Sequence, residues 1–293
     1  AIPVANAQKQ TFWSHFMLQD KAMLANLSIS RWTAQRIDSK VTREVTQAHN
    51  ATSDSGDFRK TLVDRAHLKQ LTASASAMRA FHNKLTLPWD DNSDRILPSA
   101  LYQEYTTGMK HMRLADEQLR RDFVALYPQL LAAAPKRLGT LYNPKDFPTI
   151  SQIADKFDIR ISLKPIPSAD DFRVNVGDEA TAMIREQLTA ENDAKFQAAM
   201  RECYTRVQDV VGHISTTLRK EDPRIFDTLI TNARDLVACL PALNLTGDPI
   251  LEELRQELDA MLPSPNALRA NAQTRTKTAD AADAILAKMK AYQ

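Results

Sequence analysis

Hydrophobic and polar residues alternate in two stretches of the chain, which predicts two strands. Residues 24–31, LANLSISR, place Leu27 and Ile29 on one side and Asn26 and Ser28 on the other. Residues 157–164, FDIRISLK, alternate in the same way. Because successive side chains of a strand point to opposite faces, both patterns are typical of half-buried strands. Residues 172–174, FRV, predict a third short strand.

Over most of the remaining chain, apolar residues recur every three or four positions, which predicts helices. The sequence holds only six glycines, and long segments contain neither glycine nor proline. Apolar residues from Tyr105 to Leu130 nearly follow a heptad repeat, which favours packing along another helix. The predicted helices cover about residues 8–23, 34–49, 58–86, 100–132, 178–220, 224–240, 248–262 and 279–292.

These elements predict an α+β fold that is predominantly helical, with long helices around one small three-stranded sheet. We expect a single mostly helical domain over residues 1–262, with strands near 24–31, 157–164 and 172–174. Residues 263–293 begin with a polar stretch that contains no acidic residue, PSPNALRANAQTRTKT. This stretch predicts a flexible basic C-terminal arm, followed by a short terminal helix.

The location of the protein is predicted from what the sequence lacks. No apolar run approaches the length of a membrane span, so we expect no membrane association. The first residues do not have the pattern of a secretory signal, which favours the cytoplasm, and the host cytoplasm for a phage-encoded protein. Cys203 and Cys239 have no Cys or His at ligand spacing, so we expect both to be small buried residues.

Charge is distributed unevenly along the chain. The net charge is +2, but residues 165–262 hold 10 basic and 18 acidic residues, a net charge of −8. The rest of the chain therefore has a net charge of +10. This asymmetry predicts a basic surface for an anionic partner, with the acidic region turned away from it.

A cationic stretch with a tryptophan directly follows the first predicted strand. Between Arg31 and Arg43, Asp38 is the only acidic residue. Single-stranded nucleic acid needs cations for its phosphates and flat rings for its bases, so this stretch predicts such a binding site. Alternatively, Trp32 belongs to the core and the charges form a solvated face. The predicted nucleic-acid-binding residues are Arg31, Trp32, Arg36, Lys40, Arg43, Lys136, Arg137, Tyr142, Lys145, Arg160, Lys164, Arg173, Arg269, Arg275 and Lys277.

Motifs of common enzymes do not occur in the sequence. There is no glycine-rich phosphate loop and no GxSxG motif, and the six histidines are scattered without metal-binding spacing. We therefore expect no enzymatic activity, no catalytic residue, no metal and no cofactor. A hydrolase whose carboxylates come together only in the fold remains an alternative.

The segment LANLSISRWTAQRI resembles the start of a bacterial and phage family of unknown function, whose members have a Leu-x-Ile-x-Trp strand before a basic helix. More specifically, the chain is similar to the single-stranded-DNA-binding RNA polymerase cofactors of short-tailed bacteriophages. This resemblance implies a helical protein with a small sheet that is not an OB barrel. It also implies binding of single-stranded DNA without strong sequence preference, and recruitment of a phage RNA polymerase to early promoters.

A second hypothesis is a helical structural or assembly protein that acts by self-association or by docking a partner. The apolar stripe from Tyr105 to Leu130 supports this hypothesis. Under either hypothesis we expect a homo-oligomer.

Overall fold

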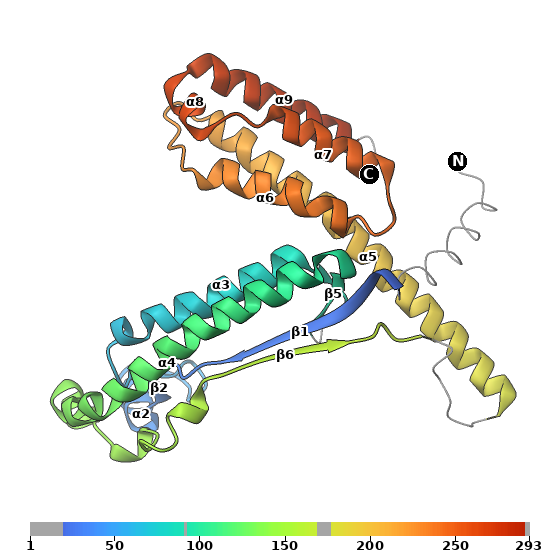
Figure 1. Cartoon of the computed structure of the whole chain (residues 1–293). Coiled ribbons are helices and arrows are strands. Elements are labelled where there is room, and N and C mark those ends of the chain that lie inside the picture. The colour runs from blue at the N-terminus through green and yellow to red at the C-terminus, as the bar shows by residue number, and fades with distance from the viewer. Residues whose placement is uncertain (1–19, 91–92, 169–176, 291–293) are drawn as a thin grey trace. The chain divides into compact units, whose positions relative to one another are not determined.

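A computed structural model describes residues 20–90, 93–168 and 177–290 of the chain. Within these residues the fold is α+β and predominantly helical, as predicted (Figure 1). The α-helices are α2 (Ser39–Ala48), α3 (Lys69–Leu85), α4 (Tyr102–Leu138), α5 (Asp178–Leu218), α6 (Thr228–Leu243), α7 (Pro249–Met261), α8 (Pro265–Ala270) and α9 (Ala272–Lys290).

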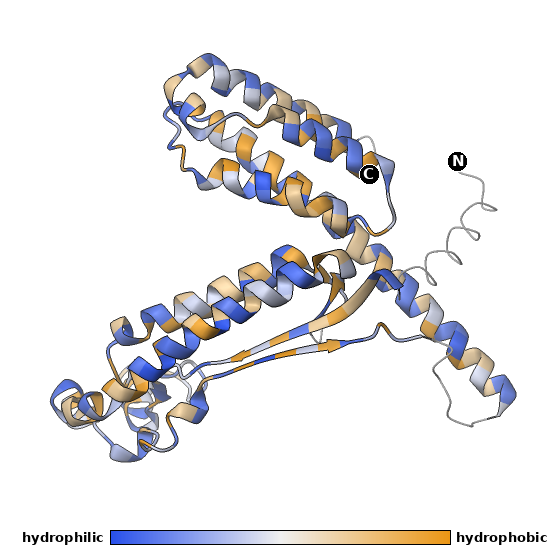
Figure 2. Ribbon diagram, in the orientation of Figure 1, coloured by the Kyte–Doolittle hydropathy of each residue, from blue (hydrophilic) through white to orange (hydrophobic). Residues whose placement is uncertain are grey.

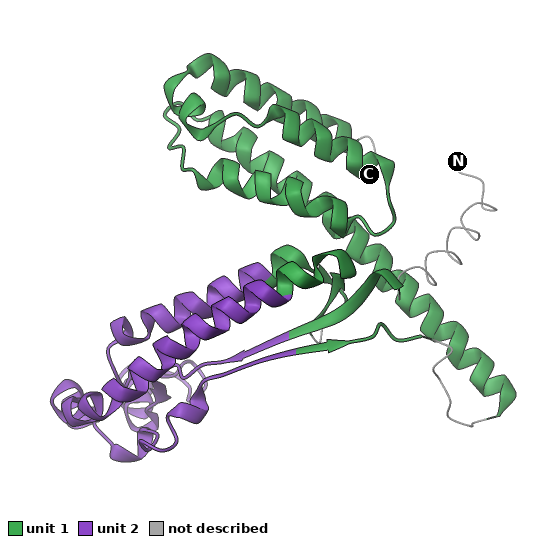
Figure 3. Ribbon diagram, viewed as in Figure 1, with its two compact units in different colours: residues 1–26, 82–105, 162–293 green, residues 27–81, 106–161 purple. Residues whose placement is uncertain are grey.

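The chain divides into two compact units (Figure 3). Unit 1 consists of residues 1–26, 82–105 and 162–293, and unit 2 of residues 27–81 and 106–161. The single domain predicted for residues 1–262 therefore differs from the observed organisation. Each unit is assembled from segments that are distant in sequence, because long elements such as α4 contribute to both.

Strands form two small open sheets rather than the one sheet predicted. The first has the order β4-β5-β1-β6, with β1 (Ala22–Ser30), β4 (Leu87–Pro88), β5 (Asp94–Pro98) and β6 (Asp158–Lys164). The second pairs β2 (Gln35–Ile37) with β3 (Arg59–Thr61). Both predicted strands that lie in the described residues are confirmed as β1 and β6. The third, at 172–174, lies outside the described residues, as does most of the helix predicted for 8–23.

Two predicted helices are shorter than expected because strands occupy their beginnings. In place of a helix over 34–49, the chain forms β2 and then α2, which starts after Asp38. The Asp38 side chain accepts hydrogen bonds from the N–H groups of Lys40 and Val41, so it caps the helix. In place of a helix over 58–86, the chain forms β3, a 3₁₀ turn at Arg65–Leu68 and then α3.

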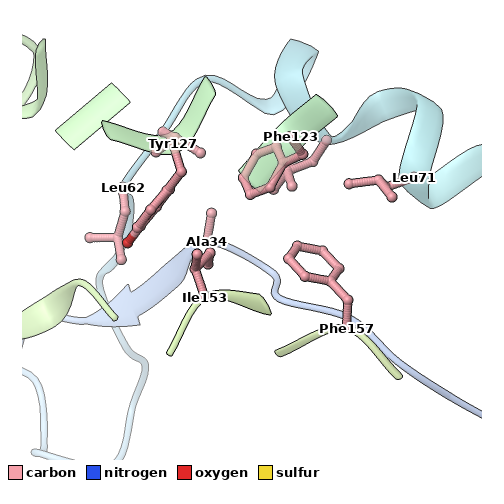
Figure 4. Packing of buried hydrophobic residues seen from close by; sticks show 9 residues of the cluster. Ala34, Leu62, Leu71, Phe123, Tyr127, Ile153 and Phe157 are labelled. Atoms are coloured by element: carbon pink, nitrogen blue, oxygen red, sulfur yellow. The ribbon is translucent and has the colours of Figure 1, made fainter. Parts of the chain in front are cut away.

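The core of unit 2 lies between α3, α4 and the segments that follow α4. Phe123 and Tyr127 of α4 pack with Leu71 of α3 and with Ile153 and Phe157 (Figure 4). Hydrophobic residues recur between polar ones along both helices (Figure 2). The heptad-like stripe of α4 therefore does pack along another helix, as the sequence predicted, and that helix is α3.

A close approach between α3 and α4 occurs at Gly108. A Cβ atom added there would lie 2.3 Å from the Phe81 ring, so only glycine fits without a shift of the ring. Ser74 of α3 also donates a 2.8 Å hydrogen bond to Asp116 of α4. The contact later in α3 is made with the earlier residue of α4, so the two helices are antiparallel.

Helices α5, α6, α7 and α9 pack together in unit 1. Cys203 of α5 and Cys239 of α6 are both buried and free, which confirms the prediction of buried small residues. In place of the predicted flexible stretch, residues 265–270 form α8 and α9 begins at Ala272; the predicted terminal helix is part of α9. Ala279, Ala282 and Ile285 of α9 are buried. Within the described ranges, none of the helices is both long enough and apolar enough to cross a bilayer.

Candidate nucleic-acid interface

Charge is separated between the two units. Unit 2 holds 18 lysines and arginines against 11 aspartates and glutamates, a net charge of +7. Unit 1 holds 20 against 25, a net charge of −5. Most of the predicted binding residues belong to unit 2, namely Arg31, Trp32, Arg36, Lys40, Arg43, Lys136, Arg137, Tyr142, Lys145 and Arg160.

Arg31 and Trp32 serve the core of unit 2. The Arg31 guanidinium lies 2.6 Å from Asp116, whose side chain is only 4% exposed. The Trp32 ring packs edge-on against Tyr127, with centroids 5.5 Å apart, and tilted against Phe123 at 6.1 Å. Trp32 is half-buried: its ring packs against the core of unit 2, and part of the residue stays exposed. The Arg31 charge is largely neutralised by its carboxylate partner.

A buried lysine joins the two cationic segments of unit 2. Lys60 of β3 has a side chain only 5% exposed. Its Nζ atom lies 2.8 Å from Asp38, 2.8 Å from Asp146 and 2.8 Å from the carbonyl oxygen of Leu141. We call this set, Asp38, Lys60, Leu141 and Asp146, the Lys60 cluster. It fixes the start of α2 to the segment that follows α4.

Electrostatics favour the ionised forms of Lys60 and Asp38. Burial alone would lower the pKa of Lys60, but its contacts with Asp146 and Asp38 outweigh burial and hold the pKa above its usual value. The hydrogen bond from Lys60 and the N–H of Val41 hold the pKa of Asp38 below its usual value. The cluster contains one cation and two carboxylates. Arg36 lies 3.9 Å from Asp146 and brings the local charge to zero.

The Lys60 cluster holds several predicted residues beside one another on the surface of unit 2. Arg36 and Lys40 flank Asp38 in sequence, and their side chains are 64% and 82% exposed. In the second segment, Tyr142 follows Leu141 and Lys145 precedes Asp146. Lys145 is exposed and Tyr142 is half-buried. The sequence segments around 36–43 and 142–145 therefore form one surface, although about 100 residues separate them.

Lys136 and Arg137 lie in the last turn of α4, immediately before this segment. Cations there interact favourably with the carbonyl end of the helix, which gives both residues a structural reason to be basic. Gly139, with φ of +53°, ends the helix in the left-handed conformation that glycine adopts without strain. Arg137 lies 4.0 Å from Asp64. Among the described residues, Arg43, Lys136 and Lys145 have no carboxylate within ion-pair distance.

The remaining predicted residues do not join this surface. On β6, Arg160 pairs with Asp158 at 2.6 Å, and Lys164, in unit 1, pairs with Asp94 at 3.0 Å. Arg173 lies outside the described residues. The remaining three, Arg269, Arg275 and Lys277, belong to α8 and α9 of unit 1.

Two of these three cations stabilise unit 1 and do not lie on a flexible arm. Arg269 forms an ion pair with Asp227 and donates to the carbonyl of Ile225. Arg275 donates to the carbonyls of Leu268 and Arg269 and so ties α8 to α9. Lys277 is exposed.

Lys60 is the residue that inspection of the sequence missed. The available signal was its position in the dipeptide Arg59–Lys60, shortly after the polar segment NATSDSGD at 50–57, which also fits a solvated helix. Its partners Asp38 and Asp146 are 22 and 86 positions away, and nothing in the sequence pairs them with it.

In the ranges that the structure covers, no group of three or more His, Cys, Asp or Glu side chains is placed to hold a metal ion. The chain matches no protein-family model, no curated protein and no solved structure. What this surface can bind is therefore inferred from its own residues.

Proposed function

We propose that unit 2 binds single-stranded DNA without strong sequence preference, through the surface around the Lys60 cluster. The observation that carries the proposal is the charge of +7 on unit 2, with exposed cations from two distant segments held side by side. Arg36, Lys40 and Arg43 supply one side and Lys136 and Lys145 the other. Such cations bind phosphates and release counterions from the strand.

Aromatic residues contribute less to this surface than the sequence suggested. Trp32 is half-buried and packs with Phe123 and Tyr127, which leaves less of its ring for stacking on bases. Tyr142 is half-buried and lies tilted against Phe147, with ring centroids 5.9 Å apart. Phosphate contacts therefore dominate the proposed affinity, which agrees with weak sequence preference.

The polymerase role rests on the resemblance of the sequence to phage RNA polymerase cofactors. In that role, unit 2 would hold the single strand and the acidic unit 1 would meet the polymerase. Self-association through α4 has less support, because residues of its apolar stripe such as Phe123 already pack inside unit 2. Formation of a homo-oligomer stays a prediction that light scattering can test.

A charge-matched pair of variants tests DNA binding. In unit 2, Arg36→Gln/Lys40→Gln/Arg43→Gln removes three exposed cations of the proposed surface. In unit 1, Arg201→Gln/Lys220→Gln/Arg224→Gln removes two arginines and one lysine that are likewise exposed. Binding of a labelled single-stranded oligonucleotide is measured by fluorescence anisotropy at several salt concentrations.

We expect the unit 2 variant to bind at least about tenfold more weakly, and its salt slope to fall by about 2, since each phosphate contact on a single strand contributes about 0.7. The unit 1 variant should bind as the wild type does. Equal losses in both variants, or affinity that does not change with salt, would contradict the proposal. Equal affinity for a duplex of the same sequence would remove the preference for single strands.

A further inference from the structure

Beside the proposed phosphate-binding surface, unit 2 contains a cavity of about 330 Å³. It lies between α2 and the segment 51–58, and residues of both line it. Thr42, Val45 and Thr46 of α2 line it together with His49, which caps the end of the helix, and from the segment come Ala51, Ser55, Gly56, Asp57 and Phe58. The volume is at the lower end of the range that holds small ligands.

The aromatic wall of this cavity is held in place by backbone hydrogen bonds. The N–H of Phe58 donates to the Thr42 hydroxyl at 3.0 Å, and the carbonyl of Phe58 accepts from the N–H of Asp38 at 2.9 Å. The Thr42 hydroxyl donates in turn to the carbonyl of Asp38 at 2.9 Å. Phe58 is thus fixed to the first turn of α2, the turn that Asp38 caps and Lys60 anchors.

The lining suits a flat and mostly apolar group with polar edges. Most of the exposed lining area comes from apolar atoms, including those of Val45, which is 46% exposed, and of the half-buried Phe58. Among the lining residues, His49, Ser55 and Asp57 have side-chain hydrogen-bond donors or acceptors. Arg43 follows the lining residue Thr42, and Arg59 follows Phe58, and both are exposed. Neither arginine lines the cavity itself, so they would bind the phosphates that adjoin a base stacked on the aromatic ring.

We propose that this cavity receives one nucleobase of the bound strand, stacked against Phe58. The proposal rests on the DNA binding proposed above and supplies an aromatic ring in addition to the half-buried Trp32. It places the base contact next to α2, the helix that carries Lys40 and Arg43, whose charges would hold the adjoining phosphates.

Two probes separate the base contact from the phosphate contacts. One is a labelled oligonucleotide of deoxycytidines about 16 nucleotides long, and the other an oligonucleotide of equal length made of abasic residues. Phe58→Leu keeps an apolar side chain but removes the ring, and Phe58→Trp keeps a ring. Phe226→Leu is the matched control, because Phe226 is a 67% exposed phenylalanine of unit 1.

We expect Phe58→Leu to weaken binding of the deoxycytidine strand about tenfold and to leave binding of the abasic strand unchanged. Phe58→Trp should restore the affinity, and Phe226→Leu should change neither probe. Unchanged binding in Phe58→Leu, or an equal loss for both probes, would overturn the base site. Equal, salt-dependent binding of both probes by the wild type would also overturn it while leaving phosphate binding intact. Absence of any binding by the wild type would overturn both proposals.

Discussion

His82 links the stability of unit 1 to pH. The ring is buried, and its Nδ1 atom lies 2.8 Å from the Tyr105 hydroxyl. Burial, helped by the charge of Arg95, lowers the pKa of His82 from 6.5 to about 4. Between these values the unfolded chain binds a proton and the folded chain does not, so stability falls as pH decreases from 6.5 to 4. We expect a loss of up to about 3 kcal/mol over this window.

Urea denaturation at several pH values, followed by circular dichroism, measures this effect in the wild type and in His82→Gln. The variant lacks the titrating ring, so its free energy of unfolding should change less between pH 6.5 and 4.5. His213→Gln serves as control, because His213 of α5 is exposed. Parallel pH profiles for the wild type and His82→Gln would show that His82 does not cause the dependence.

The burial of a single residue could be predicted from the sequence where the residue type alone decides it. Cys203 and Cys239 are buried because a lone cysteine behaves as a small apolar residue. Trp32 and Lys60 were not predicted, because their positions depend on partners distant in sequence. A tryptophan next to cations fits either a surface ring or a core ring, and only Phe123 and Tyr127 decide between them. Lys60 is buried only because Asp38 and Asp146 pair with it.

Between helices, the contact of Gly108 with Phe81 determines how closely α4 approaches α3. In Gly108→Ala the new Cβ would lie 2.3 Å from one ring atom of Phe81 and 2.8 Å from another. The ring and helix would have to shift, which costs about 1–3 kcal/mol. The better helix propensity of alanine offsets at most about 1 kcal/mol of this cost. We therefore expect Gly108→Ala to lower the free energy of unfolding, measured by urea denaturation.

Gly212 of α5 provides the opposite case. Nothing lies within 4 Å of a Cβ atom added there, so Gly212→Ala should stabilise the protein by up to about 1 kcal/mol.

In the double variant Phe81→Ala/Gly108→Ala the clash is absent, and the two effects should not add. A Gly108→Ala variant as stable as Gly212→Ala would mean that the ring moves aside without cost.

Elements were predicted well where a long periodic pattern specifies them. The ranges expected for α5 and α7, 178–220 and 248–262, differ from the observed ones by at most two residues at each end. The short strands β4 and β5 were missed, because prolines and acidic residues at 88–98 are typical of a turn. β5 forms because β1 supplies a partner, for example through Leu24 paired with Ile96, and β4 in turn pairs with β5. Such pairing is non-local, so local periodicity does not reveal it.

At the scale of the whole molecule, the sequence indicated that charge is asymmetric but not how the chain divides. The acidic stretch 165–262 was visible as a composition shift, and it lies entirely in unit 1. The division into two units was not visible, because its boundaries fall inside continuous elements rather than in linkers. The candidate surface was likewise predicted only in part. Its cations were found, but the Lys60 cluster that brings them together was not.

Within unit 1, α9 packs against other helices through a buried face. Substitutions on this face can therefore test whether α9 is packed in solution. Asp283 of α9 accepts a hydrogen bond from Ser215 and pairs with Arg219, and Lys288 pairs with Glu253 and Glu257. A packed helix loses stability when a buried side chain is truncated, whereas a solvated arm does not. We expect Ile285→Ala to destabilise the protein by about 3 kcal/mol, because Ile285 is only 3% exposed.

Leu286→Ala is the matched control, since the adjacent Leu286 is half-buried and should lose clearly less. Urea denaturation compares the two variants at one pH. The order matters more than the size of either loss, because only a helix docked in the observed orientation protects position 285 more than position 286. If both substitutions left the free energy of unfolding unchanged, residues 272–290 would act as an arm in solution. Unit 1 would then be complete without α9, and the cations of α8 and α9 would again become candidates for binding DNA.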